Sequence, residues 1–233
     1  MLQYVKVFTL MDAAPEEVFV AAELVMALDD PAAEVAAVGG KGASLARLAR
    51  AGLRVPPGFH LTTRAYLEFT AHSGLREQVL AAVSGAGDAG PDVLESMAQR
   101  VGELFAATPV PPDVTAAVAG AYAGLGHDVA VAVRSSATTE DLADLSFAGQ
   151  HATYLNVRGE TAVLDAVKRC WASLWTSRAI DYRARHGVAT AQASMAVVVQ
   201  RLVPADAAGV LFTVDPVGGG CDQVVINASW GLG

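Results

Sequence analysis

The sequence predicts an α+β protein built in two lobes. Residues 92–107 and 113–123 have helical spacing of apolar residues and are joined by a proline-rich link. Residues 195–203, 209–214 and 223–227 are apolar, β-prone runs that predict three strands near the end of the chain. Helices that come first and strands that gather last favour an α+β arrangement, and no internal repeat is present.

Composition describes a chain that can bury a core. Hydrophobic residues make up 53% of the 233 residues and charged residues 17%, which excludes a disordered chain. No run approaches the roughly 18 apolar residues of a membrane helix, and the start lacks the basic and apolar regions of a signal peptide. We therefore expect a cytoplasmic protein without a membrane partner.

The net charge of −8 argues against a nucleic-acid partner, because binding to a phosphate backbone requires clustered Lys and Arg. A single nucleotide is not excluded, since two or three cations in a pocket suffice for a triphosphate.

Two elements are expected in the N-terminal region before residue 30. Residues 4–10 predict a strand, and residues 15–28 predict a helix with a proline at its first position. Further along, Thr62 is expected to cap a helix in which Tyr66 and Phe69 share one side.

Residues 161–186 give the longest helical signal, with Cys170 on the apolar stripe. A free cysteine packs as a small hydrophobe, so we interpret Cys170 as a core residue. Cys170 and Cys221 match no metal-ligand spacing, and a disulfide or a catalytic thiol is the alternative for either residue.

A glycine-rich turn at residues 39–42 precedes a helix whose apolar face is expected at Leu45, Leu48 and Ala49. Glycines let backbone N–H groups approach a phosphate, the helix N-terminus adds partial positive charge, and Lys41 adds a full charge. The spacing does not match a Walker loop. The alternative is an ordinary turn with a solvated lysine.

Arg134 follows the apolar run 129–133, which predicts a buried strand with polar residues at its end. A guanidinium is a planar, permanently charged group that suits phosphate oxygens. The alternative is an ion pair of Arg134 with Glu140 or Asp141.

Residues 146–153 are polar around Gly149, which is typical of a flap whose backbone closes on a ligand. A hairpin turn is the alternative. His151 in this segment could be catalytic or simply solvated.

Gln200 interrupts an apolar run and could line an adenine pocket, or it could be structural. Asp215 could bind a metal, although its position before Pro216 favours a turn-capping role.

Taken in order, several motifs resemble the N-terminal ATP-binding domain of the phosphoenolpyruvate (PEP) synthase, or pyruvate, water dikinase, family. Rifampicin phosphotransferase and pyruvate phosphate dikinase share this domain. The motifs are VGGKGASL, VPPGF, VAVRSSATTEDL, SFAGQ, TYLNV, SLWTSRAIDYR, VVVQRLVPADAAGVLFTVDP and INASWGLG.

The resemblance covers residues 34–233 and implies an ATP-grasp-like, two-lobed nucleotide-binding domain, incomplete at its C-terminal end. Residues 1–33 would be an N-terminal extension of unknown role, 34–128 the mainly helical part, and 129–233 the truncated ATP-grasp-like lobe.

By the same resemblance, Lys41 and Arg134 would bind the phosphates of ATP. Gly149 and Thr153 would belong to the loop that closes over them, and Gln200 would lie beside the adenine. The residues themselves single out every one of these positions except Thr153, which comes from the resemblance alone.

The resemblance also implies a reaction. In such enzymes ATP phosphorylates a histidine in a separate swivelling domain, and that histidine passes the phosphoryl group to pyruvate or to an antibiotic hydroxyl. None of the five histidines lies in a matching motif (His60, His72, His127, His151 and His186). We expect no catalytic residue in this chain and magnesium ligands beyond residue 233.

On this basis the expected function is the ATP-binding portion of a PEP synthase-type dikinase, inactive alone. A second chain that carries the rest of the enzyme is a candidate partner. The ATP-binding part of a rifampicin phosphotransferase is one alternative. A non-catalytic nucleotide-binding module is the alternative from another class.

Overall fold

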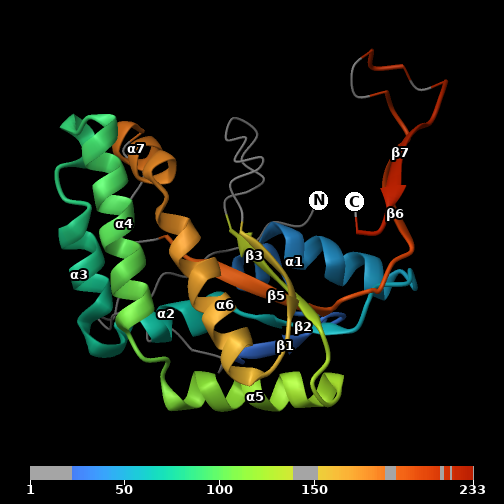
Figure 1. Cartoon of the computed structure of the whole chain (residues 1–233), viewed down its shortest axis with the longest axis horizontal. Helices are drawn as coiled ribbons and strands as arrows, with labels where there is room; N and C mark the ends of the chain where they lie inside the picture. Colours follow the sequence, from blue (N-terminus) through green and yellow to red (C-terminus); the bar gives the residue numbers. More distant parts are fainter. Residues whose placement is uncertain (1–22, 139–151, 187–192, 216–217, 221, 233) are drawn as a thin grey trace, which may run out of the picture.

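The computed structural model describes residues 23–138, 152–186, 193–215, 218–220 and 222–232. It contains two separate β-sheets. The five-stranded sheet has the order β1-β2-β5-β3-β4, with antiparallel neighbours throughout, and the two-stranded sheet pairs β6 with β7 (Figure 1). The strands are β1 (Val25–Ala27), β2 (Gly58–Leu61), β3 (Val131–Ala137), β4 (Thr153–Val157), β5 (Met195–Arg201), β6 (Ala207–Phe212) and β7 (Val225–Trp230).

Helices surround the larger sheet. They are α1 (Val35–Arg50), α2 (Thr63–Ala71), α3 (Leu75–Ala82), α4 (Pro91–Ala107), α5 (Pro112–Leu125), α6 (Glu160–Ala172) and α7 (Ser177–Arg185). Short 3-10 turns, η1 (His72–Gly74), η2 (Ala86–Asp88) and η3 (Ser173–Trp175), link some of them. α4 and α5 begin at prolines, whose missing N–H is not needed at a first helical position. The predicted α+β class is confirmed.

The main core lies on the face of the sheet that carries Phe59, Leu61, Val133 and Val199. Helices α2, α4, α5 and α6 contribute the other side of this core. Its aromatic centre consists of Tyr66, Phe69, Phe105 and Trp171, and the Phe69 and Trp171 ring centroids are 4.9 Å apart.

Three details of this core test the sequence predictions. Tyr66 and Phe69 are both buried on one side of α2, as predicted. Thr62 occupies the cap position of α2, but its hydroxyl donates to the Glu23 carbonyl at 2.9 Å and so ties β1 to this helix. Cys170 is unpaired and fully buried, as expected of a core residue.

The opposite face of the sheet is covered by α1 through small side chains. A separate buried cluster consists of Met26, Ala33, Val38, Ala43 and Ala46. The predicted apolar face of this helix is wrong, since the Leu48 side chain is 44% exposed. Alanines and glycines form the buried stripe because they allow the helix backbone to approach the strands closely.

Tertiary pairing overrides helical periodicity near the N-terminus. The end of the helix predicted at 15–28 is a strand, because residues 25–27 pair with β2 at the edge of the sheet. Residues 1–22, which include the strand predicted at 4–10, lie outside the described residues.

The long helix predicted at 161–186 is divided into α6, η3 and α7. Thr176 causes the break, since it is extended and its hydroxyl accepts from the Ala179 N–H at 3.3 Å to begin α7.

The three strands predicted near the end of the chain are present as β5, β6 and β7, but they do not form one cluster. β5 is the central strand of the larger sheet and pairs with β2 on one side and β3 on the other. This sheet therefore takes strands from both sides of the boundary expected between residues 128 and 129, and that boundary stays a prediction.

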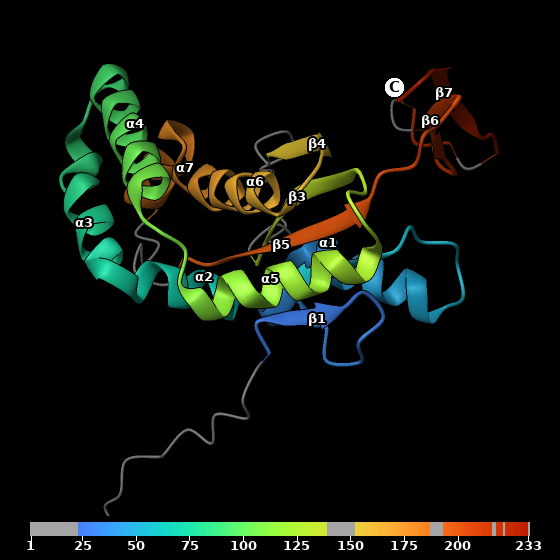
Figure 2. The ribbon, with the colours of Figure 1, turned by 60° about the horizontal axis from the view of Figure 1, so that its bottom comes forward.

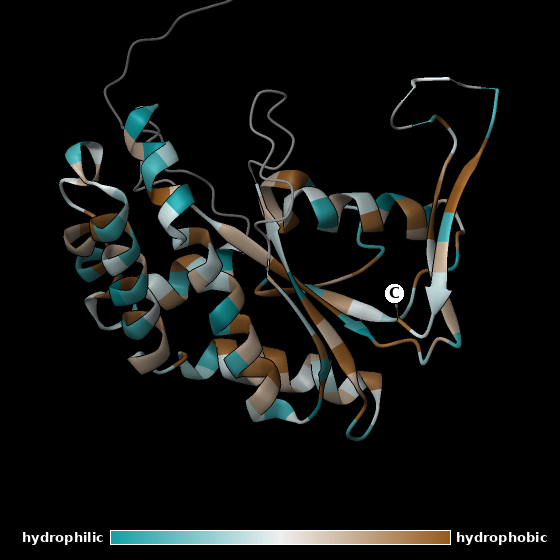
Figure 3. Ribbon diagram, turned by 45° about the horizontal axis from the view of Figure 1, so that its top comes forward, coloured by the Kyte–Doolittle hydropathy of each residue, from teal (hydrophilic) through white to brown (hydrophobic). Residues whose placement is uncertain are grey.

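β6 and β7 form a ribbon that extends away from the larger sheet (Figures 1 and 2). Among the described residues, neither strand has a second partner. Figure 3 shows brown, apolar segments along this ribbon. Large apolar residues on it are exposed: Val210 55%, Leu211 56%, Phe212 41%, Ile226 66% and Trp230 89%.

Across the described segments, none of the helices combines the length and the apolar character that crossing a bilayer requires.

Candidate nucleotide-binding face

The glycine-rich segment forms a kink in α1 that is joined to the end of β3. Gly39 has φ 70° and ψ 173°, a backbone conformation that essentially only glycine adopts. The Ser136 hydroxyl donates to the Val38 carbonyl at 2.7 Å and accepts from the Gly42 N–H at 3.0 Å. One buried serine therefore fixes both sides of the kink against the sheet.

Two of the glycines are needed for packing. A Cβ at Gly39 would lie 2.2 Å from the Ser136 carbonyl oxygen, and one at Gly42 would lie 2.9 Å from the Val38 Cβ. The Gly42 N–H, which the sequence suggested for a phosphate, is already bonded to Ser136. The kink thus places Lys41, between Gly40 and Gly42, at the start of the straight part of α1.

β-Sheet register brings Arg134, Thr153 and Gln200 onto the face that α1 covers. Arg134 is opposite Val198 of β5 and Thr153 of β4. Gln200 is opposite Ala132, two residues before Arg134. Residues paired across antiparallel strands share a face, and diagonal neighbours lie about 7–8 Å apart. Arg134, Thr153 and Gln200 therefore lie on the same face as Ser136.

The buried Cys170 thiol lies beside the start of β4. Burial raises the pKa of the Cys170 thiol to about 12, and the positive charges of Arg169 and Lys41 act against that rise. The Cys170 sulfur is 3.9 Å from the Ala152 carbonyl oxygen, next to Thr153. The protonated, buried thiol lacks the character of a catalytic nucleophile.

Gln200 of β5 and Arg134 of β3 differ in their surroundings. The Gln200 side chain is 6% exposed, and its amide donates to the Pro56 carbonyl at 3.3 Å. This bond supports the structural alternative for Gln200 and leaves its adenine contact a prediction. The Arg134 side chain is partly exposed, and its alternative partners Glu140 and Asp141 lie outside the described residues.

Gly149 and His151 also lie outside the described residues. The segment predicted as a flap is described only at 152–153, where β4 begins with Thr153 exposed.

His60 is a site feature that sequence reasoning missed. Its side chain is fully buried, its Nε2 lies 3.3 Å from the Leu28 carbonyl oxygen, and its Nδ1 has no hydrogen-bond partner. A Cβ at Gly42 would be 3.2 Å from that Nδ1, so the imidazole lies beneath the kink of α1. Burial lowers the pKa of His60 and keeps the ring neutral. Its position between Phe59 and Leu61 in a strand was the available signal.

The described residues offer no evident metal centre. No group of three or more His, Cys, Asp and Glu side chains gathers among them. Asp215 closes a turn, in which its carbonyl accepts from the Gly219 N–H at 2.8 Å and its N–H donates to the Gly220 carbonyl at 2.9 Å. The turn predicted at Asp215 is therefore present.

Comparison with known proteins decides the family. Residues 35–233 match the family described as "Pyruvate phosphate dikinase, AMP/ATP-binding domain". The chain belongs to this family.

Known relatives carry two different names. This AMP/ATP-binding domain is 48% identical to a rifampicin phosphotransferase of Streptomyces sp over 212 residues, 90% of this chain and 24% of the relative. It is 44% identical to a phosphoenolpyruvate synthase of Aeropyrum pernix over 204 residues, 84% of this chain and 25% of the relative. The domain thus spans about a quarter of the length of these relatives, and the resemblance expected from its motifs is confirmed.

Proposed function

We propose that this chain is the ATP-binding part of a PEP synthase-type dikinase, with the phosphates of ATP held by Lys41 and Arg134. The observation that carries the proposal is the meeting of four elements on one face of the sheet. α1, β3, β4 and β5 each contribute one residue of the set, although these residues are far apart in the sequence.

The chemistry of this face suits a nucleotide. An ammonium and a guanidinium supply the charge that a triphosphate needs in an otherwise acidic protein, and Thr153 offers a hydroxyl beside Arg134. Gly149 would belong to the loop that closes over the phosphates, and Gln200 would lie beside the adenine. The expected ATP-grasp arrangement would use the β6–β7 ribbon as part of its second lobe.

Magnesium is expected with ATP, but the described residues bring together no carboxylate cluster that fits it. What the described residues contribute is binding and orientation of the phosphates, on which phosphoryl transfer depends more than on covalent protein chemistry.

The phosphoryl acceptor is a further part of the proposal. We favour pyruvate, reached through a phosphohistidine carrier in another domain or a second chain. The alternative acceptor is rifampicin, favoured by the 48% identity to a rifampicin phosphotransferase.

Isothermal titration calorimetry of the purified chain with ATP, in the presence and absence of magnesium, tests the core of the proposal. Saturable binding of ATP, with much weaker binding of GTP, is the expected result. Equal binding of both nucleotides would contradict an adenine site at Gln200. The matching test uses a longer homologue that is a complete enzyme. The parent enzyme should bind ATP, and its variant with Lys41→Ala and Arg134→Ala should not.

A further inference from the structure

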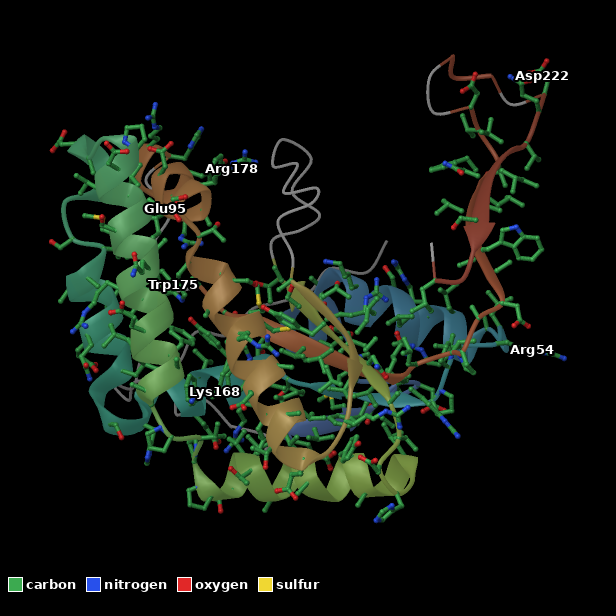
Figure 4. The ribbon with its side chains drawn as sticks, in the orientation of Figure 1. Arg54, Glu95, Lys168, Trp175, Arg178 and Asp222 are labelled. Carbon is green, nitrogen blue, oxygen red and sulfur yellow. The ribbon has the colours of Figure 1, made fainter. Side chains whose placement is uncertain are left out.

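A second set of unusual contacts lies at the far end of the helical layer, where α7 meets η2 and η3. Arg183 of α7 is only 7% exposed. Its guanidinium carbon lies 4.8 Å from the centroid of the Trp175 ring, and its Nη2 donates to the Leu174 carbonyl at 2.8 Å. Figure 4 shows Trp175 beside α4, well away from the β6–β7 ribbon.

The buried charge of Arg183 lacks an anionic partner among the described residues. Its Nε is buried without a hydrogen bond. Burial lowers the pKa of Arg183 to about 10, and among the described residues the neighbouring Tyr66 hydroxyl acts against this lowering. The Tyr66 hydroxyl itself accepts from the Trp175 indole N–H at 3.1 Å. A buried charge is costly unless it is paired, so a counter-ion would stabilise this arrangement.

Arg183 also lines a hollow of about 240 Å³. Its other lining residues are mainly apolar or glycine: Val83, Gly85, Ala86, Gly87, Trp175, Ile180 and Ala184. At roughly 30 Å³ for each water-sized group, this hollow has room for about eight non-hydrogen atoms.

The residues that line this hollow indicate which kind of ligand would fit it. One cation in an apolar lining suits a single negative charge, because a dianion such as phosphate would need further donors to replace its water. A planar carboxylate matches the planar guanidinium, and a short hydrocarbon body matches the apolar lining.

We propose that the hollow between η2 and α7 is a binding site for a small organic monoanion, a carboxylate with a short apolar body, paired with Arg183. The site is separate from the nucleotide-binding face and does not depend on the function proposed for that face.

Butyrate is a suitable probe, with butyramide as its neutral counterpart and inorganic phosphate as the dianionic comparison. We expect butyrate to bind the purified chain with a Kd on the order of millimolar. Binding should shift the indole N–H signal of Trp175 in a ¹⁵N spectrum, assigned through Trp175→Phe. Butyramide and phosphate should bind at least about tenfold more weakly.

Three variants locate the site. Arg183→Gln should weaken butyrate binding by about ten- to a hundredfold, the range expected for a charged hydrogen bond. Gly87→Leu should also weaken it by filling the hollow, since a Cβ at Gly87 meets nothing within 4 Å and the backbone there has room for a side chain. Arg178→Gln, on the exposed side of the same helix, is the matched control and should bind like the parent.

Several outcomes would overturn the proposal. They are failure of butyrate to bind at tens of millimolar, equal binding of butyramide, tighter binding of phosphate, or parent-like binding by Gly87→Leu. If Arg183→Gln does not fold, Gly87→Leu decides the question, because it leaves the guanidinium in place. ATP titrations of the same variants should remain unchanged.

Discussion

The two faces of the five-stranded sheet are built from different residues. The face toward α2, α4 and α6 packs against large aromatic side chains, with Phe69 and Trp171 fully buried. The face toward α1 packs against alanines and glycines and carries His60, Arg134 and Gln200. Burial of apolar area scales with side-chain size, so the aromatic face supplies most of the stability. The α1 face can therefore carry polar groups and lie close to a bound ligand.

The sharpest test of this division removes an aromatic side chain from the core. Phe69→Ala should lower the free energy of unfolding by about 3–5 kcal/mol, since it leaves a cavity between Trp171 and Phe105. Urea unfolding measures this loss. Leu67→Ala, at a side chain of α2 that is 44% exposed, is the control and should cost much less. A loss as small as that of the control would mean that the aromatic face is not the main source of stability.

Removing either predicted phosphate-binding cation should affect ATP binding and not the stability of the fold. Lys41→Ala and Arg134→Ala should each weaken ATP binding by about ten- to a hundredfold, while changing stability little. Lys41→Arg should not restore full affinity, because a planar fork does not replace a compact ammonium. Calorimetry of a longer homologue or of the complete enzyme gives the affinities.

Arg47→Ala is the matched control for these variants, since Arg47 is exposed on the same helix. ATP affinities equal to that of the parent in both alanine variants would remove the phosphate-site assignment and return residues 39–42 to an ordinary turn.

Ser136 affects both the stability of the fold and the predicted ATP binding, because it is a buried polar group that holds the kink of α1 next to Lys41. Ser136→Ala would leave the Val38 carbonyl and the Gly42 N–H without their partner, so it should cost about 1–3 kcal/mol. It should also weaken ATP binding by moving Lys41. Ser96→Ala, at an exposed hydroxyl on α4, is the comparison. Unchanged stability with unchanged ATP affinity would show that the kink does not depend on this serine.

His60 gives the smallest expected effect, and it depends on pH. Its folded-state pKa is lowered by burial from the ordinary value of 6.5, so the unfolded chain binds the proton more readily. The free energy of unfolding should therefore fall as the pH drops below 6.5 toward the folded-state pKa, by at most about 1.4 kcal/mol per unit.

Unfolding curves at several pH values between 7.5 and 5 measure this dependence, each value being chosen at roughly half-unit steps around the ordinary histidine pKa. The slope should be reduced in His60→Gln and retained in His72→Gln, at an exposed histidine. An identical slope in both variants would assign the pH dependence to other groups.

The sequence determined the family, the α+β class and most of the helices, because these follow from local signals. Prolines at the starts of α4 and α5, and apolar spacing along α2 and α6, act within one or two turns. The positions of Lys41 and Arg134 were also visible, since a charged residue beside glycines or at the end of an apolar run stands out.

Only the tertiary structure decided what those local segments contact. It converted residues 25–27 from a predicted helix into a strand, because pairing with β2 outweighs periodicity. It placed β5 at the centre of the sheet, and it assigned Gly39 and Gly42 to packing against Ser136 and Val38. Hydrogen bonds between residues 38 and 136 and between 60 and 28 join segments far apart in the chain, which no local pattern encodes.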